Sequence, residues 1–199
     1  MIEIDQIKEN YKNFNDRKIE DIAKTQAKDI REDVVPVLFT EIERRGLGPE
    51  LINWVKAERR VLSPVELDRM KEKIRWLPCP ACGRKGSRLE GIVIRTVVGF
   101  IIGADYETAQ RIACEDCRNR MLRNAVLKTV FLGWWGLPEG FFYTPYALIR
   151  SAGDIFKRDR DSEKIMEDFI QTNIGLITLG HDKEEVISVL VVKFNKKED

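Results

Sequence analysis

Two cysteine pairs decide how this chain folds: Cys79-Pro80-Ala81-Cys82 and, after a gap of 31 residues, Cys114-Glu115-Asp116-Cys117. A CxxC pair brings two thiolates to one ion, and two such pairs supply the four sulfur ligands of a tetrahedral site. A closed set of soft thiolates leaves no position for water, so the pattern predicts one structural zinc ion. Iron, unligated cysteines and a redox-active pair stay open as alternatives, although no thioredoxin-like βαβ pattern surrounds either pair.

The residues between the pairs predict a β-hairpin. The stretch Ile92–Ile102 is rich in β-branched side chains, which favours a strand or two strands bent near Gly99. Gly103-Ala104-Asp105 is a turn candidate, and Tyr106–Ala113 would return to the second pair. Knuckle, hairpin and knuckle in this order are typical of a zinc ribbon, which we assign to residues 79–117.

Residues 1–78 predict a helical module. Apolar residues recur at spacings of three and four, and several helix ends are marked by their sequence. Asn15 is an N-cap candidate, Gly46 follows a helix that ends in two arginines, and Ser63-Pro64-Val65-Glu66 reads as a capping box. We interpret this module as a bundle that packs on the rest of the chain, with a partner-binding helical module as the alternative.

Residues 118–153 predict a Trp-rich helical hairpin. Between Ala125 and Ile149 only Lys128 and Glu139 are charged. This apolar run is long enough for one membrane span. Glycines, prolines and Glu139 interrupt the run, and a broken helix leaves backbone groups unpaired in lipid. Basic residues flank both ends of the run. A single span would put one basic cluster on each side of the membrane, whereas two short segments would place both clusters on the cytoplasmic side. A shallow hairpin in the membrane interface is one interpretation, and a buried core of a soluble domain is the other.

The hairpin and its basic flank supply the predicted contact residues for a membrane or a partner. The tryptophans would lie at headgroup depth, and the arginines would meet acidic groups. These residues are Trp134, Trp135, Phe141, Phe142, Arg118, Arg120 and Arg123.

Residues 154–199 predict a helical C-terminal tail. Asp154–Asp161 reads as a charged linker, and Ser162 as the cap of a helix that ends at Asn173-Ile174-Gly175. Residues 183–194 predict a further helix or strand. His181, the chain's only histidine, follows a glycine and reads as a solvated loop residue. The whole pattern predicts an α+β protein in which the tail follows the helical module, the ribbon and the Trp-rich hairpin.

Composition narrows the class of protein. The chain has 199 residues, 43% hydrophobic, with a net charge of +1, so a packed core is expected and bulk charge does not make it a polyanion binder. Residues 79–150 carry 10 basic and 6 acidic side chains, so the middle is basic. The N-terminus lacks a basic region followed by an apolar run, so no secretory signal is expected. Reduced cysteines then indicate a cytoplasmic protein.

The middle of the chain resembles a group of uncharacterised bacterial zinc-ribbon proteins. They pair a CxxC…CxxC ribbon with a membrane-associated GWWGxPxG segment, here Gly133–Gly140, often near a tripeptide like Tyr143-Thr144-Pro145. Glu139 stands where that group often has tryptophan. The patterns Glu41–Gly46 and Phe169–Gly175 are also similar to parts of such proteins. The resemblance implies an architecture and association with a membrane, and it carries no activity.

These observations favour a non-enzymatic, zinc-stabilised binding or adaptor protein. It would associate peripherally with the inner face of the cytoplasmic membrane or with a membrane protein. One alternative is a nucleic-acid-binding zinc ribbon that uses basic side chains on phosphates and Phe100, Tyr106 or tryptophans on bases. Another is a soluble adaptor or immunity-type protein with one protein partner. An enzyme is not expected, because no nucleophile is paired with a base. The basic residues of the nucleic-acid alternative are Arg84, Lys85, Arg88, Arg95, Arg111 and Arg118.

Overall fold

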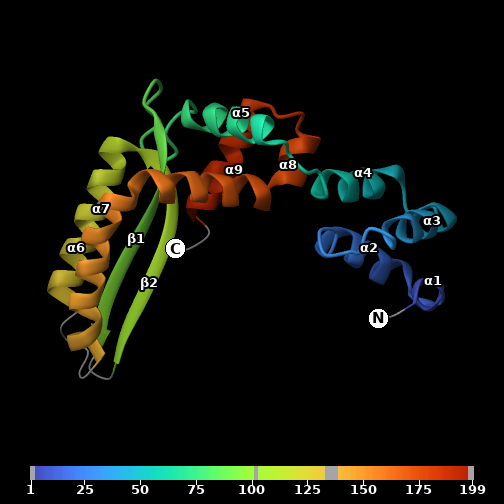
Figure 1. Ribbon diagram of the computed structural model, residues 1–199, viewed down its shortest axis with the longest axis horizontal. Helices are drawn as coiled ribbons and strands as arrows, with labels where there is room; N and C mark the ends of the chain where they lie inside the picture. Colours follow the sequence, from blue (N-terminus) through green and yellow to red (C-terminus); the bar gives the residue numbers. More distant parts are fainter. Residues whose placement is uncertain (1–2, 101–102, 133–138, 197–199) are drawn as a thin grey trace. The chain divides into compact units, whose positions relative to one another are not determined.

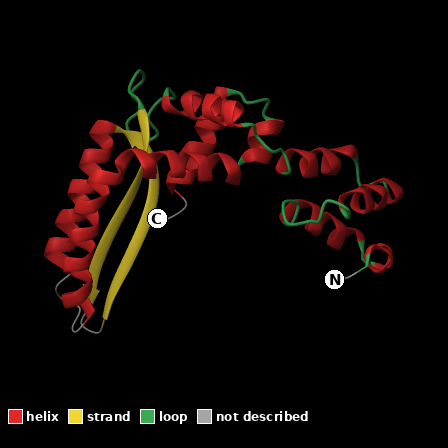
Figure 2. Cartoon of the chain, in the orientation of Figure 1, coloured by secondary structure: helices red, strands yellow, loops and turns green. Residues whose placement is uncertain are grey.

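The computed structural model describes residues 3–100, 103–132 and 139–196, with side chains given except at 99–100, 103–104, 139–144, 147–148 and 150–158. This part of the chain is mostly helical and of the α+β class, with nine helices and one two-stranded antiparallel hairpin (Figures 1 and 2). The chain forms two compact units. The first comprises Met1–Leu62 and Asn173–Lys183, and the second comprises Ser63–Thr172 and Glu184–Asp199.

The first unit is a set of helices around an apolar core. Its helices are α1 (Ile4–Asn13), α2 (Asp16–Thr25), α3 (Val35–Arg45), α4 (Pro49–Glu58) and α8 (Ile174–Leu179). Ile19, Leu38, Ile42 and Val55 are fully buried, and each stands on the helical stripe of its own segment. Burial of such side chains stabilises the unit by roughly 1.5–3 kcal/mol each before the entropy of ordering is counted.

Helix ends in the first unit follow the predicted signals. The Asn15 side chain accepts a hydrogen bond from the Lys18 backbone N–H at 2.8 Å and so caps α2. Gly46 ends α3 in the left-handed conformation, with φ of 66°, which glycine adopts without a Cβ clash. Both predictions are confirmed. In the second unit, Ser63 and Glu66 form the predicted capping box.

One arginine joins three helices of the first unit. The Arg45 guanidinium donates to the backbone oxygens of Tyr11 and Lys12, at 2.8 and 3.1 Å, in the last turn of α1. It also donates to Asp16 at 2.9 Å and to the buried carboxylate of Glu41. A cation at a helix C-terminus meets carbonyls that have no partner within the helix. Arg45 therefore fixes the end of α1 against α2 and α3.

The second unit is built on the hairpin. Its elements are α5 (Pro64–Arg75), β1 (Leu89–Phe100), β2 (Gly103–Cys114), α6 (Glu115–Leu132), α7 (Glu139–Thr172) and α9 (Glu184–Lys196). The strands pair from Leu89 opposite Cys114 to Phe100 opposite Gly103. Helices α6 and α7 run along the hairpin (Figure 1). Helix α5, which the sequence groups with the N-terminal helices, belongs to this second unit.

Side chains from the helices bind the outer edge of β1. The backbone N–H of Gly91 donates to the Ser162 hydroxyl of α7 at 2.9 Å, and that of Val97 donates to the Thr129 hydroxyl of α6 at 3.1 Å. The two residues are an even number of positions apart, so their N–H groups point to the same side of the strand. An open strand edge invites pairing with another chain, and these hydroxyls occupy part of it.

The side chain of Asn195 in α9 binds the outer edge of β2. Its side-chain oxygen accepts from the Ile112 N–H at 2.8 Å, and its nitrogen donates to the Ile112 carbonyl at 2.9 Å. The amide thus copies the two bonds of a neighbouring strand at one residue. Nothing in the sequence pattern marked Ser162, Thr129 or Asn195 for this role, because it depends on which helix packs beside which strand.

The C-terminal half differs from the sequence prediction. Asp154–Asp161, predicted as a charged linker, lies within the continuous helix α7, so that prediction is wrong. Asp154 and Arg158 stand four residues apart, as do Lys157 and Asp161, and such opposite charges favour a helix. Ser162 consequently lies inside α7 and does not cap a helix start. After the predicted stop at Asn173, the chain forms α8, which the sequence analysis missed.

Candidate metal centre

Four cysteine side chains meet where the hairpin begins and ends. The Sγ atoms of Cys79, Cys82, Cys114 and Cys117 all lie within 4.8 Å of one another. A tetrahedron with metal–sulfur bonds of about 2.3 Å has sulfur–sulfur edges of about 3.8 Å. The Cys82 and Cys114 sulfurs are 3.8 Å apart, so the geometry fits a metal ion bound by four thiolates.

The first pair lies in a tight turn after α5. The Cys79 N–H donates to the Arg84 carbonyl at 2.9 Å, and the Gly83 N–H donates to the Cys79 carbonyl at 2.7 Å. Gly83 has φ of 72°, a conformation that residues with a Cβ rarely adopt, so the turn needs glycine there. The turn places Cys79 in the interior and leaves Cys82 exposed.

The second pair spans the junction between a strand and a helix. Cys114 is the last residue of β2, and Cys117 lies in the first turn of α6. The N-terminus of a helix carries a partial positive charge that favours a thiolate. A metal bound here would tie together the knuckle, the end of β2 and the start of α6. The sequence analysis predicted a second knuckle at this pair, and the structure has the end of a strand followed by the start of a helix.

Backbone donors prepare one of the thiols for ionisation. Burial acts to raise the pKa of Cys79, but hydrogen bonds from the backbone N–H groups of Cys114, Ala81 and Cys82 outweigh it and lower the pKa from 9.0 to about 7. The Cys114 N–H lies 3.4 Å from the Cys79 sulfur. Donation from N–H groups to a thiolate stabilises its charge, which is the form that binds a metal.

The other two buried thiols would depend on a bound cation for their ionisation. Burial and hydrogen bonding with neighbouring thiols raise the pKa of Cys117 to about 12, and burial raises that of Cys114. Four thiolates in one place repel each other, and a divalent ion removes most of that repulsion. Arg120 donates to the Cys117 sulfur at 3.5 Å, and Arg84 pairs with Asp116 beside the site. The Arg120 guanidinium thus places a positive charge beside the Cys117 sulfur.

The predicted contact arginines do not share one environment. Arg118 is buried, and its guanidinium donates to Glu90 at 2.5 Å and to Glu115 at 3.2 Å. The charge of Arg118 is therefore paired with carboxylates inside the second unit. Arg120 and Arg123 are exposed on α6. Trp134 and Trp135 lie outside the described residues. Phe141 and Phe142 belong to the first turn of α7, and their side chains are not described.

Apolar side chains are exposed in the last two turns of α6 and in the first three turns of α7. Phe131 is 68% exposed and Ile149 is 73% exposed. We call this surface the apolar end, and its described members are Val126, Leu127, Val130, Phe131, Leu132, Tyr146 and Ile149. Among the described residues, no helix is both long enough and apolar enough to cross a membrane.

The basic residues of the nucleic-acid alternative are also divided. Arg84, Lys85 and Arg88 are exposed in the turn that follows the first cysteine pair. Arg111 and Arg118 are buried, and Arg95 is half-buried. The Tyr106 ring packs against the Tyr146 ring, with the two ring centroids 6.3 Å apart, so Tyr106 already has an aromatic partner within the protein. The basic surface of the second unit is thus smaller than the sequence suggested.

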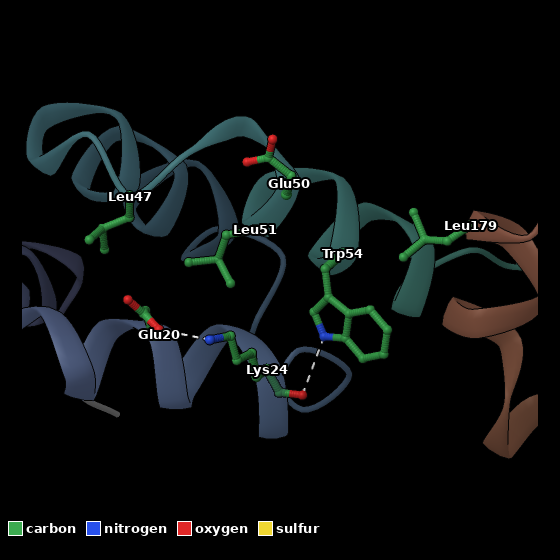
Figure 3. A pocket seen from close by; sticks show the side chains of 7 residues that line it. All are labelled: Glu20, Lys24, Leu47, Glu50, Leu51, Trp54 and Leu179. Atoms are coloured by element: carbon green, nitrogen blue, oxygen red, sulfur yellow. Dashed lines mark hydrogen bonds and ion pairs between the residues drawn. The ribbon is translucent and has the colours of Figure 1, made fainter.

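The first unit carries a shallow groove of about 530 Å³ between α2 and α4 (Figure 3). Leu47, Leu51, Trp54 and Leu179 line it, and the Trp54 indole donates to the Lys24 carbonyl at 3.3 Å. The Glu20 carboxylate on its wall pairs with the Lys24 ammonium group at 2.7 Å. The charged side chains among the described residues that line the groove are Glu20, Lys24 and Glu50.

The sequence matches no protein-family model, and the chain has no significant match among the curated proteins or the solved structures compared with it.

Proposed function

We propose that this protein is a non-enzymatic, zinc-stabilised binding protein that associates peripherally with the inner face of the cytoplasmic membrane through its apolar end. The observation that carries the proposal is the outward face of α6. It presents Arg120 and Arg123 in its first half, and Leu127 and Phe131 at its far end. A basic surface leading to an apolar one matches an anionic membrane, in which phosphates lie outside the acyl chains.

The exposed side chains form a contiguous group. Val126 and Val130 are four residues apart, as are Leu127 and Phe131, and Leu127 and Val130 are three apart, so the four share one side of α6. Soluble monomers rarely expose large contiguous apolar patches, and those that do generally use them to bind. The remaining sequence of the helix connection, Gly133-Trp134-Trp135-Gly136-Leu137-Pro138, is also free of charge. Tryptophan favours the headgroup layer of a bilayer.

The metal would control where this end points. Cys114 closes β2 and Cys117 opens α6, so an ion bound to both fixes the direction in which α6 leaves the hairpin. Four thiolates fill a tetrahedral shell, so zinc would act as a structural element and not as a reaction centre. The proposed role is accordingly that of a scaffold for a binding surface.

Flotation with liposomes tests the proposal. Purified protein should float with vesicles rich in phosphatidylserine or phosphatidylglycerol and bind phosphatidylcholine vesicles more weakly, since each basic residue near an anionic surface contributes about 1 kcal/mol. Val130→Asp should reduce the bound fraction severely. Val189→Asp makes the same substitution at an exposed position on α9 and should have little effect. A wild-type protein that stays wholly unbound would contradict the proposal.

Nucleic-acid binding is the second candidate, and one surface favours it. Trp76 is 59% exposed at the end of α5, in the same unit as the exposed Arg84, Lys85 and Arg88. An exposed indole with nearby cations suits a stacked base and its phosphate. A gel-shift experiment at low salt, with Trp76→Ala as the comparison, separates this candidate from the membrane proposal.

A further inference from the structure

We infer that Cys82 is the oxidation site of the metal centre, where a hydroperoxide drives formation of a disulfide bond with Cys114 and thereby releases the metal ion. The inference assigns a regulatory modification to a site that the proposed function treats as structural. It rests on the zinc ion of that proposal and not on membrane binding, so the two can fail separately.

Cys82 is the exposed member of the cysteine cluster. Cys79, Cys114 and Cys117 are buried, with relative exposures of 2%, 1% and 3%. Cys82 is exposed to solvent. A dissolved oxidant reacts with a sulfur that it can reach, so the difference in exposure decides which ligand is oxidised first.

The surroundings of Cys82 favour this reaction. All residues from 81 to 86 are exposed, and this segment carries the cations Arg84 and Lys85. Reactive cysteines lie in electropositive, partly exposed surroundings of this kind. The thiolate is the form of cysteine that binds a metal, and it is also the form that attacks an oxidant.

The Cys114 sulfur lies close enough to become the disulfide partner. The Sγ atoms of Cys82 and Cys114 are 3.8 Å apart, and a disulfide bond of about 2.05 Å requires an approach of about 1.8 Å. Cys114 pairs with the buried Leu89 at the end of the hairpin, so the sheet holds its backbone. The turn of Cys82 is held at its base by the hydrogen bond from the Cys79 N–H to the Arg84 carbonyl, and it is exposed beyond that bond. The movement should therefore fall on Cys82.

The reaction is a two-electron oxidation of two cysteines, written here for hydrogen peroxide. The Cys82 thiolate attacks one peroxide oxygen, so that an S–O bond forms, the O–O bond breaks and hydroxide leaves. The Cys114 thiolate then attacks the Cys82 sulfur, so that the S–S bond forms, the S–O bond breaks and a second hydroxide leaves. The two sulfurs lose two electrons, the peroxide gains them, and the two hydroxide ions take protons from solvent to become water.

The disulfide bond would leave the metal ion with too few ligands. Only the Cys79 and Cys117 thiolates remain, whereas a structural zinc site uses four ligands. Cys117 lies in the first turn of α6, so release of the ion frees the start of this helix from the turn that carries Cys79. In a reducing compartment the bond would be transient, as is usual for disulfides that serve in redox sensing.

Peroxide treatment of the intact, zinc-loaded protein tests the inference. Hydrogen peroxide should release about one zinc ion per chain, measured with a colorimetric zinc indicator. Peptide mapping after alkylation of free thiols should find Cys82–Cys114 as the first disulfide, and a dithiol reductant with added zinc should restore the metal content. If the protein keeps its zinc, or if the first disulfide is a different one, the inference is overturned.

Two matched variants test whether exposure of the sulfur is the cause. Histidine also binds zinc, so Cys82→His and Cys117→His each leave a site of three cysteines and one histidine. Cys82→His removes the exposed sulfur and should slow the release of zinc about tenfold or more. Cys117→His keeps Cys82 and Cys114 and should release zinc at least as fast as the wild-type protein. Equal rates in the two variants would overturn the inference. If either variant does not load zinc, the peptide map of the wild-type protein decides.

The outcomes separate the inference from the proposed function. If the purified protein carries no metal ion, the zinc site of the proposed function and the inference both fail. If peroxide releases zinc through Cys82 but the protein does not float with vesicles, the membrane proposal fails and the oxidation site stands. If the protein floats and its zinc resists peroxide, the inference alone fails.

Discussion

The Ser162 hydroxyl of α7 accepts a hydrogen bond of 2.9 Å from the backbone N–H of Gly91 in β1. The bond forms only because Gly91 has no side chain. A Cβ on Gly91 would lie 2.7 Å from the Cβ of Ile165 and 3.0 Å from the Ser162 carbonyl. Glycine and serine together allow the longest helix of the chain to approach the strand closely, and this contact holds α7 along the hairpin.

Ser162→Ala should lower the free energy of unfolding by about 1–3 kcal/mol, because it leaves a buried N–H without an acceptor. Gly91→Ala should cost a similar amount or more, because the helix must move away from the strand. Urea unfolding measures both. Ser188→Ala on α9 is a control at a half-buried serine of the same unit and should cost less than about 0.5 kcal/mol. A cost for Ser162→Ala no larger than that of the control would refute the role of the bond.

Local signals in the sequence predicted local structure well. The Asn15 cap, the left-handed Gly46 and the Ser63–Glu66 capping box all depend on residues within one turn of each other, and all are confirmed. Strand β1 and the proximity of the cysteine pairs were also predicted, because a β-branched run and two CxxC pairs are each typical of few other structures. Pairing of the strands then follows from bringing the two CxxC pairs together.

Features that depend on tertiary packing could not be predicted in this way. The charges of residues 154–161 fit a solvated linker and a long exposed helix equally well, and only packing of α7 along β1 decides between them. The buried Ser162 looked like a helix cap because serine is common at caps. The position of α6 beside β1 follows from the direction in which α6 leaves β2, and no short-range pattern encodes that direction.

Removal of the metal should loosen the second unit selectively. With a chelator, or in Cys82→Ser, residues 79–117 and the start of α6 should lose protection in hydrogen exchange, because the thiolates that tie them together would repel each other. The first unit, which comprises α1 to α4 and α8, contributes no residue to the cysteine cluster and should keep its protection. Ser87→Ala lies in the same turn and serves as the control. Equal loss of protection in both units would show that the site does not act locally.

Arg45 should matter more to stability than its neighbour Arg44. Arg45→Met leaves the Glu41 carboxylate with one partner fewer and removes the donors at the end of α1, so a loss of about 3 kcal/mol is expected. Arg44 pairs with Glu41 from a side chain that is 57% exposed. Arg44→Met should therefore cost less than about 1 kcal/mol. Equal losses in thermal unfolding would contradict the assignment of Arg45 as the residue that joins the three helices.

Glu41 should make the first unit sensitive to acid. Hydrogen bonds from Arg44 and, to a smaller extent, Arg45 lower the pKa of Glu41 from 4.5 to about 2, although burial opposes them. A folded-state pKa below the unfolded one stabilises the protein above about pH 4.5, and this contribution is lost as the pH falls toward about 2. Urea unfolding between about pH 6 and pH 3 should show a decline in stability that is smaller in Glu41→Gln. An identical decline in both proteins would exclude Glu41 as its source.

Flotation of the intact, metal-loaded protein with anionic vesicles, repeated after treatment with a zinc chelator, tests whether a metal-fixed α6 binds a membrane. The purified protein should carry about one zinc ion per chain, float with the vesicles, and lose binding when the metal is removed, since four thiolates would fill one tetrahedral site that fixes α6. A protein that holds its zinc and stays at the bottom of the gradient would contradict it.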